Sequence, residues 1–317
     1  MSQVTIRELA AACGVSIGTV SKALRRSERI SPETVARIEE KARELGYVGN
    51  RAARALSARS RRVAVVLPQT AAHLERYRAG CRLAEATVLL HGIDLCEVSP
   101  EEAGEGYDAV LTHPSLASRL AVGPDVPVAI FGGRAPTLHS VLEVMPEYRI
   151  GGRLAAQFLA FATSGGAAAV LTARRGAYGE EEAVRGFREL SAKLGIPVAA
   201  VAECGESARS IGAEVRRLLA ANARLRGLFV TSSFAASVVA ALADSRRRVT
   251  VVAADFTRPA QEALRSGGVA ALLYPSPERQ VQAALEGLCA YLGTGEAAAS
   301  VAIRQELVLK SNLESYL

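Results

Sequence analysis

Three short amphipathic segments separated by turn residues begin the chain, and this spacing limits what its first part can fold into. The segment Thr5–Glu8 places a hydroxyl three residues before a carboxylate, the capping-box pattern that begins a helix. Gly14 permits a tight turn, after which Ser16 can cap a second helix. Ser31–Pro32 supplies an N-cap and a first-position proline for a third helix. The pattern predicts a helix-turn-helix unit braced by a third helix.

The outward face of the second helix indicates a partner. Val20, Ala23 and Leu24 face inward at helical spacing, which leaves small polar and aliphatic residues outside. The outward residues are Ser16, Ile17, Gly18, Thr19, Ser21, Lys22 and Arg25. Hydroxyls suit phosphates, an ammonium suits guanine edges, and an aliphatic group suits a thymine methyl in the major groove. The face therefore favours duplex DNA, and a polar-faced bundle that packs on another protein is the alternative.

The excess positive charge is confined to the start of the chain. Residues 1–62 hold 13 Lys and Arg against 6 Asp and Glu, a net charge of +7. Residues 63–317 hold 25 against 26, a net charge of −1. A general surface effect would spread the charge along the chain, so its confinement favours an anionic polymer as partner.

A fourth stretch, Asn50–Arg59, is capped, alanine-rich, basic and too short to be a stable helix alone. Together with this stretch, the N-terminal head, residues 4–59, resembles the LacI–GalR family of bacterial transcription repressors. The matching stretches are Val4–Ile6, Ala12–Ser16, Thr19–Leu24, Glu44–Tyr47 and Asn50–Leu56. The resemblance implies a hinge helix that folds on DNA and a Leu56 that wedges between base pairs from the minor groove. A linker leucine that covers the next domain is the alternative for Leu56.

The face and the resemblance together predict the DNA contacts. Base contacts are predicted for Ile17, Gly18, Lys22, Ala53 and Leu56. Phosphate contacts are predicted for Thr5, Ser16, Thr19, Ser21, Arg29 and Asn50. Gly18 has no side chain and should relax the contact with the base at its position. Lys22 stands where relatives usually carry arginine. A single ammonium group therefore replaces a guanidinium that can donate two hydrogen bonds to one guanine, which should weaken discrimination there.

Composition excludes several other classes of protein. The chain of 317 residues is long enough for two or three domains. Its five cysteines are scattered without C-x-x-C spacing, as expected for free thiols in a reducing cytosol. The N-terminus has no apolar signal segment, and no run approaches the ~20 apolar residues of a membrane span. We expect a cytoplasmic protein with no membrane partner.

No pattern supports catalysis. The four histidines are dispersed without metal-ligand spacing. The sequence contains no G-x-S-x-G, P-loop or dinucleotide fingerprint. We therefore expect a protein that is not an enzyme and that needs no cofactor or metal.

From Val63 onward, apolar strands alternate with amphipathic helices, which implies parallel sheets with helices on both faces. Strands are predicted at Val63–Leu67, Ile93–Val98, Ala109–Thr112, Val128–Phe131, Ala168–Thr172, Val198–Ala202, Gly227–Thr231, Val249–Ala254 and Val269–Leu273. Helices are predicted at Leu74–Leu90, Arg149–Ala162, Glu180–Leu194, Ala208–Ala221 and Glu278–Leu292. These strands are too many for one comfortable sheet, so two lobes with a cleft are expected.

The fold class expected is an all-α helix-turn-helix head followed by an α/β two-lobed core, and the family resemblance implies a core like a periplasmic binding protein. The resemblance continues in Gly151–Ala156, Arg185–Phe187 and Glu306–Ser311. We predict a DNA-binding domain at 1–48, a hinge and linker at 49–62 and a core at 63–317. Relatives usually carry a helix between the second and third strands. Here Ser99–Gly106 is too short for one, so the N-lobe should lack a helix.

Ligands of open α/β sheets bind beyond the carboxyl ends of the strands. The predicted effector-binding residues are His73, Arg134, Arg174, Tyr178, Phe234, Asp255 and Tyr274. Asp255 matches the family position whose carboxylate accepts hydrogen bonds from a sugar or base, and capping of the helix that follows is the alternative. Ala183 and Phe234 stand where the family has an arginine and an aspartate, so two of three polar anchors are missing.

The sequence therefore predicts a dimeric, sequence-specific repressor that binds a near-palindromic operator and responds to a small-molecule effector. A constitutive DNA binder with a vestigial cleft is the first alternative. A module that docks a phosphocarrier protein, as some relatives do, is the second, and no residue argues for it in particular.

Overall fold

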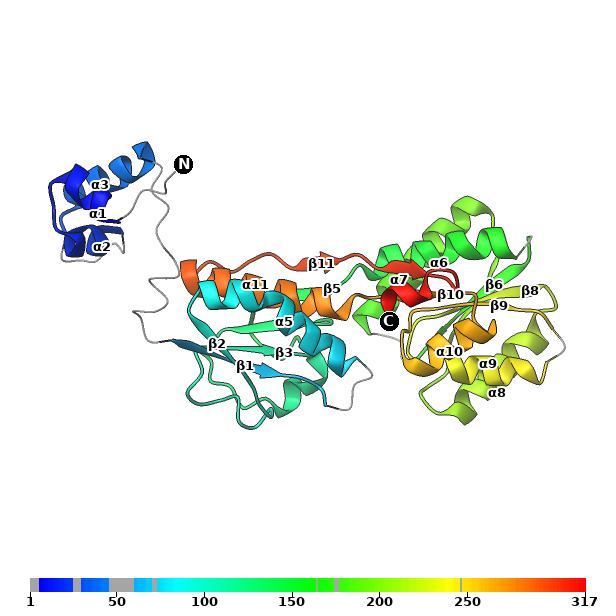
Figure 1. Ribbon diagram of the computed structural model, residues 1–317. Coiled ribbons are helices and arrows are strands. Elements are labelled where there is room, and N and C mark those ends of the chain that lie inside the picture. Colours follow the sequence, from blue (N-terminus) through cyan, green and yellow to red (C-terminus); the bar gives the residue numbers. More distant parts are fainter. Residues whose placement is uncertain are drawn as a thin grey trace. The chain divides into compact units, whose positions relative to one another are not determined.

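The computed structural model describes residues 6–24, 30–45, 60–69, 73–163, 165–173, 177–245 and 247–317 (Figure 1). The chain divides into two compact units. One comprises residues 1–60 with 89–93, and the other comprises residues 61–88 with 94–317. Each unit is described by itself.

The head contains three helices, α1 (Ile6–Cys13), α2 (Ile17–Leu24) and α3 (Pro32–Glu44). Its small core consists of fully or almost fully buried Leu9, Ala10, Val20, Ala23 and Ile38. These residues recur at helical spacing, so each helix turns one apolar face inward. The turn between α1 and α2 depends on Gly14, whose φ of 65° lies in the left-handed region that glycine adopts without strain. The predicted helix-turn-helix unit is therefore present.

The first lobe of the core, the N-lobe, contains a six-stranded sheet of order β11-β5-β4-β3-β1-β2. The four strand pairs from β11 to β1 are parallel. The strands are β11 (Val301–Ile303), β5 (Ser140–Pro146), β4 (Val128–Phe131), β3 (Ala109–Thr112), β1 (Arg61–Val66) and β2 (Ile93–Glu97). Strands β3 and β4 are buried along their whole length, as expected for a parallel sheet covered on both faces.

Among the residues that the structure describes, the two long helices of the N-lobe, α5 (Leu74–Leu90) and α11 (Pro277–Thr294), cover one face of its sheet. Residues 98–108 contain no helix, as predicted from the short connection. The hydrophobic cluster of the other face instead includes Ala103, Ala135 and Leu116 of the short 3-10 helix η1 (Pro114–Arg119). A Cβ atom at Gly104 would lie 2.0 Å from the Ala121 carbonyl oxygen, so irregular backbone packs closely there. Within the described residues, this face is therefore covered by η1 and irregular backbone, in line with the predicted loss of one N-lobe helix.

The second lobe, the C-lobe, contains a six-stranded sheet of order β12-β10-β9-β8-β6-β7. All its pairs are parallel except β12 with β10. The strands are β12 (Glu306–Val308), β10 (Ala271–Tyr274), β9 (Thr250–Ala253), β8 (Leu225–Val230), β6 (Ala167–Thr172) and β7 (Val198–Glu203).

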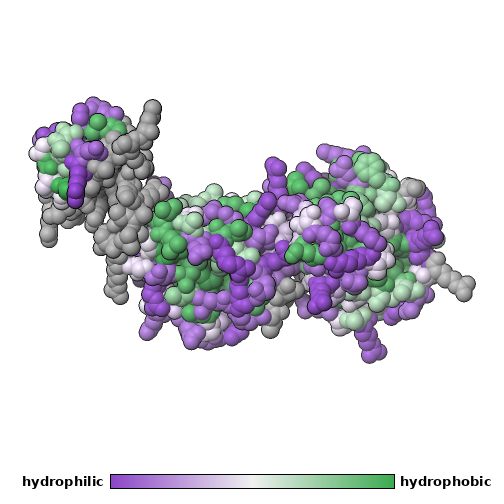
Figure 2. Space-filling model, viewed as in Figure 1, coloured by the Kyte–Doolittle hydropathy of each residue, from purple (hydrophilic) through white to green (hydrophobic). Residues whose placement is uncertain are grey.

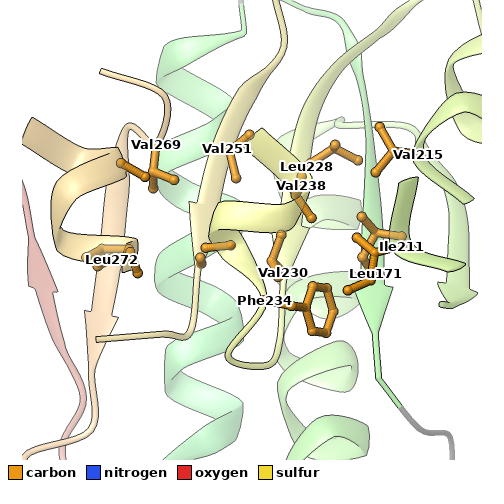
Figure 3. Packing of buried hydrophobic residues seen from close by; sticks show 14 of the residues in the cluster. Leu171, Ile211, Val215, Leu228, Val230, Phe234, Val238, Val251, Val269 and Leu272 are labelled. Carbon is orange, nitrogen blue, oxygen red and sulfur yellow. The ribbon is translucent and has the colours of Figure 1, made fainter. Parts of the chain in front are cut away.

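Helices cover both faces of the C-lobe sheet. Phe187 of α7 (Tyr178–Leu194) stacks on Phe229, and α6 (Tyr148–Ala162) packs in the same cluster. Helices α8 (Ala208–Ala221), α9 (Ala235–Ala243) and α10 (Arg258–Ser266) contribute to the opposite cluster (Figure 3). The two-lobed α/β fold is confirmed.

The chain crosses between the two sheets three times: from β5 into α6, from β10 into α11, and from β11 into β12. The second crossing is unusual. Ser276 lies between Pro275 and Pro277 with a φ of 51°, in the left-handed region that non-glycine residues rarely adopt. This crossing therefore carries local strain and is held by its surroundings.

Helices α6 and α7 pack backbone to backbone through glycines, and this contact is sensitive to size. A Cβ atom at Gly186 would lie 1.9 Å from the Arg149 carbonyl oxygen. We expect Gly186→Ala to lower the free energy of unfolding by about 1–3 kcal/mol, because the helices must separate. Gly293→Ala is the control, because an added Cβ atom at this helical position would meet no other atom within 4 Å. This substitution should raise stability slightly, since alanine favours the helix more than glycine does. Equal stability of both variants in urea unfolding would contradict this packing.

Candidate functional site

The outward face of α2 in the head combines an aliphatic side chain, an open glycine position and hydroxyl groups. Ile17 is 44% exposed, so its aliphatic side chain is available on this face. A Cβ atom at Gly18 would have the Ser16 Oγ atom, at 3.7 Å, as its nearest neighbour, so this position is open. The Thr19 backbone N–H donates to Ser16 Oγ at 3.0 Å, so Ser16 caps the helix. A helix with this surface can enter a major groove with its N-terminal end first.

The other head residues predicted to contact DNA are only partly described. Ser21 and Lys22 lie on α2, and their side chains are outside the described part. Thr5, Arg29, Asn50, Ala53 and Leu56 lie outside the described residues. Their DNA contacts stay predictions.

The core contains a cavity of about 240 Å³ between the carboxyl ends of strands from both sheets. The N-lobe side includes His73, Tyr77, His113 and Gly132, and the C-lobe side includes Tyr148, Ala183, Phe229, Thr231, Ser233, Ala254, Asp255, Phe256 and Leu273. The three crossings supply Pro146, Pro275, Pro277, Gln280 and Gln305. Parallel strands end at one edge of each sheet, which is why residues distant in sequence meet here.

Asp255 is the carboxylate of this cavity, and it is 3% exposed. Its Oδ1 accepts a hydrogen bond of 2.8 Å from the Thr257 backbone N–H, and its Oδ2 accepts one of 3.4 Å from the Ala235 N–H. These bonds tie together the segments that begin α10 and α9. Each carboxylate oxygen can accept a further bond, so the same group can fix the backbone and receive a ligand donor.

Two partly buried imidazoles line the N-lobe side. Burial lowers the pKa of His113 to about 4, and a second contribution comes from His73. Burial also lowers the pKa of His73, although the nearby Asp255 carboxylate acts in the opposite direction. Both side chains are therefore neutral at pH 7. Nδ1 of His113 accepts the Ser115 backbone N–H at 3.2 Å, so its proton resides on Nε2.

Aromatic rings form much of the remaining wall. Tyr77 packs edge-to-face on Phe131 with 4.9 Å between ring centroids, and burial raises its pKa to about 12. Tyr148 donates from its hydroxyl to the Gly132 carbonyl oxygen at 3.0 Å, across the two lobes. Burial raises the pKa of Tyr148 as well, so both phenols stay neutral. Sequence reasoning missed both tyrosines, because Tyr77 lies within α5 and Tyr148 follows β5, a strand that was not predicted.

The crossing from β10 into α11 adds a buried amide. Gln280 is 3% exposed, and its Nε2 donates to the Pro275 carbonyl oxygen at 2.7 Å. Its Oε1 has no hydrogen-bond partner within the described part of the chain. A buried acceptor without a partner costs about 1–3 kcal/mol, so a ligand donor there would recover free energy.

Several residues predicted to bind the effector lie elsewhere. The guanidinium of Arg134 lies 4.4 Å from the centroid of the Tyr178 ring and 3.3 Å from Glu143, and neither Arg134 nor Tyr178 lines the cavity. Phe234 packs in the C-lobe core with Leu171 and Val238 instead of lining the cavity (Figure 3). Arg174 is outside the described residues. Of the predicted set, the structure brings His73 and Asp255 to the cavity.

Tyr274 does not line the cavity but braces the lobes. Arg76 of α5 donates from Nη1 to the Tyr274 hydroxyl at 2.7 Å and from Nη2 to the Tyr316 carbonyl oxygen. Its guanidinium also lies 5.2 Å from the Phe256 ring centroid and 4.0 Å from Glu278. Phe256 lines the cavity, so Arg76 of the N-lobe contacts a residue of the C-lobe side of the cavity wall.

Metal and membrane sites are not found in the described ranges. There, no three His, Cys, Asp or Glu side chains are arranged to hold a metal ion. None of the helices in those ranges is long and apolar enough to cross a membrane.

Comparison with known proteins matches both parts of the chain. The model of "Bacterial regulatory proteins, lacI family" matches residues 5–50, and that of the "Periplasmic binding protein domain" matches residues 124–297. The maltose regulon regulatory protein MalI of Escherichia coli is 30% identical over 246 residues, covering 69% of each chain. The chain belongs to the LacI family.

Two further relatives show how the similarity is distributed. The regulator GntR of Pseudomonas aeruginosa is 48% identical over 68 residues, which cover 21% of this chain and 20% of that protein. The structure of the transcriptional regulator CelR in complex with cellobiose has a TM-score of 0.62 and 23% identity, covering 97% of this chain and 99% of that one. This LacI-family protein is thus a DNA-binding transcription regulator with an effector-binding domain, and such regulators are not enzymes.

The neutral imidazoles give a pH dependence of stability. The His113 pKa is about 4 in the folded chain against an ordinary 6.5, so the unfolded chain binds more protons between these values. Stability should therefore fall as pH drops from about 6.5 towards about 4, by up to roughly 3 kcal/mol from this group. His73 acts in the same direction.

Thermal melts between pH 7 and 5 test this expectation. His113→Gln should flatten the dependence, because the amide does not titrate. His139→Gln is the control, since His139 is exposed on a loop outside the cavity. A wild-type slope in His113→Gln would rule out this origin.

Proposed function

We propose that this protein is a sequence-specific repressor that binds a near-palindromic operator as a homodimer and releases or engages it in response to a small molecule in the core cavity. The observation that carries the proposal is the α2 face. A helix of eight residues with exposed Ile17 and an open Gly18 is held on a compact three-helix core. Such a helix presents base-reading positions without having to fold on DNA. The protein would act in the cytoplasm, where its DNA lies.

Dimerisation is supported by an apolar surface of α5. Leu83, Leu89 and Leu90 are 54%, 61% and 50% exposed. Figure 2 shows hydrophobic residues gathered over this side of the N-lobe. Exposed apolar clusters of this kind favour self-association, and a two-fold dimer matches a two-fold operator.

Effector control is supported by the cavity itself. It lies between both lobes, so a bound molecule contacts each lobe and can bias their arrangement. The solved structure of the relative CelR is a complex with cellobiose, which makes a sugar-like effector the first class to test. The alternative, a constitutive binder, draws on Ala183, which lines the cavity where the family arginine is missing.

Selection of bound duplexes from a random pool tests the function. The full-length protein should enrich one near-palindromic sequence at moderate ionic strength and bind it as a dimer. Enrichment of no sequence over competitor DNA would refute the proposal. The same selection with a metabolite extract distinguishes an effector-responsive repressor from a constitutive binder. A constitutive binder would occupy its DNA equally with and without the extract.

The open Gly18 position should accept a new base contact. Gly18→Gln places an amide that can pair with an adenine edge, worth about 1–3 kcal/mol of discrimination at one base pair per half-site. Gly18→Ala is the control and should change helix stability without changing sequence preference. Binding-site selection with both variants measures this, and an unchanged consensus for Gly18→Gln would show that the position does not face bases.

The hinge proposal is tested at Leu56. Leu56→Ala should lower operator affinity and reduce DNA bending, because the apolar wedge that opens a base step is lost. Ser57→Ala, the neighbouring control, should leave both unchanged. Unaltered affinity and bending in Leu56→Ala would leave the residue as an ordinary linker leucine.

A further inference from the structure

We propose that the edge of the C-lobe sheet opposite the cavity binds the phosphate backbone of a second DNA duplex, so that one protein holds two DNA segments. The proposal goes beyond operator recognition by the head, and it gives a partner to a basic surface that operator and effector binding do not use.

Charge is divided unevenly within the core. Residues 191–197, 216–226 and 244–250 hold eight Lys and Arg against one Asp, a net charge of +7. The rest of residues 63–317 holds 17 Lys and Arg against 25 Asp and Glu, a net charge of −8. The core as a whole is nearly neutral, so its positive charge is concentrated in three short segments. Such a concentration favours an anionic partner.

The fold brings these three segments to one edge of the C-lobe sheet. They connect α7 to β7, α8 to β8 and α9 to β9 (Figure 1), so each one leads into the amino end of a parallel strand. The cavity lies at the carboxyl ends of the strands, on the opposite edge. Asp244 is the single acidic residue of the three segments. We define the basic edge by six exposed residues, Lys193, Arg216, Arg217, Arg224, Arg226 and Arg248.

A structural role accounts for one arginine of these segments but not for the basic edge. Arg247 donates to four carbonyl oxygens around the end of α8 and the beginning of β8, so it stabilises the fold there. Arg224 donates from Nη2 to the Gly165 carbonyl oxygen, and Arg226 donates from Nη1 to two nearby carbonyl oxygens. A guanidinium has five N–H groups, so Arg224 and Arg226 both retain donors for a phosphate.

The width of the basic edge suits a duplex. Lys193 precedes β7 and Arg248 precedes β9, and these strands are three spacings apart in the order β9-β8-β6-β7. At about 4.8 Å for each spacing, the edge extends over about 14 Å. A duplex carries about eight phosphate charges over that length of its axis. Five of the six residues are arginines, whose guanidinium groups match the geometry of phosphate oxygens.

An acidic protein is the competing partner, because two large apolar side chains are exposed near this edge. Phe161 in the last turn of α6 is 81% exposed, and Leu194 at the end of α7 is 46% exposed. Both helices pack on the same face of the sheet. The cations, in contrast, also lie on α8 and before β8 and β9, where no exposed large apolar residue accompanies them in the described part of the chain. A uniform polyanion therefore fits the whole edge better than a partner with an apolar anchor.

Capture of a second duplex tests the proposal. Bead-tethered operator is used in excess over the full-length protein, so that the heads are occupied, and a labelled duplex without the operator is added at about 50 mM salt. We expect the labelled duplex to be retained and to be released steeply as salt rises, because phosphate contacts displace counterions. Intact operator binding without retention would overturn the proposal and leave the operator function unaffected. Retention of a labelled Glu- and Leu-rich peptide in place of the duplex would overturn it in favour of an acidic protein.

Two matched double variants separate the basic edge from net charge. Lys193 and Arg248 have no side-chain hydrogen bond or ion pair among the described residues, so Lys193→Glu with Arg248→Glu breaks no such contact. This variant should lower retention at least about tenfold and leave operator affinity unchanged, since it adds repulsion where phosphates would lie. Arg188→Glu with Arg304→Glu makes the same change in net charge at exposed positions outside the edge and should retain the duplex as the wild type does.

The comparison of the two double variants decides the proposal even without a known operator. If selection yields no operator, the proposed function fails, and the protein is tethered through an N-terminal tag for the same capture experiment. Weaker capture by the edge variant than by its control would support the basic edge as a duplex site. Equal capture by both double variants would overturn it.

Discussion

Parallel hydrogen bonding within the two sheets is the constraint on which the rest of the core depends. Strands that run in one direction end at one edge, so β1, β3 and β4 deliver their following residues to one place, as do β6, β8, β9 and β10. Three chain crossings then keep the two edges together. The cavity follows from this topology, and only the identity of its side chains is left to the individual sequence.

This division explains what could be predicted from the sequence. Strands such as Val128–Phe131 are continuous apolar runs, and their bounds were predicted correctly. Strand β5 was missed, because Glu143 interrupts its apolar pattern and Pro146 ends it. The missing N-lobe helix was predictable, since a short connection cannot hold one. The position of a residue after a strand did not reveal where its side chain points. Arg134 turns to Tyr178, and Phe234 turns into the core.

The contacts of Arg76 show why the direction of a side chain after a strand could not be predicted from the sequence. Tyr274 is the last residue of the buried strand β10 and was predicted to meet a ligand. Its hydroxyl instead accepts from Arg76 and donates to Glu278, while its ring packs on Phe256 with 4.5 Å between centroids. The partners lie 198 and 4 residues away. Only the fold brings Arg76 to the strained Pro275–Pro277 crossing, where it stabilises the cavity wall from behind.

The same reasoning bears on whether the cavity is vestigial. A space without a ligand is stabilised when apolar side chains fill it, because packing and burial both improve. This cavity instead retains a buried carboxylate, two neutral imidazoles and an amide oxygen that has no partner among the described residues. The Gln280 oxygen, which has no partner in the described part of the chain, costs free energy, and a ligand that donates a hydrogen bond to it would offset that cost. The missing family arginine at Ala183 removes one polar group from the wall and leaves these others in place.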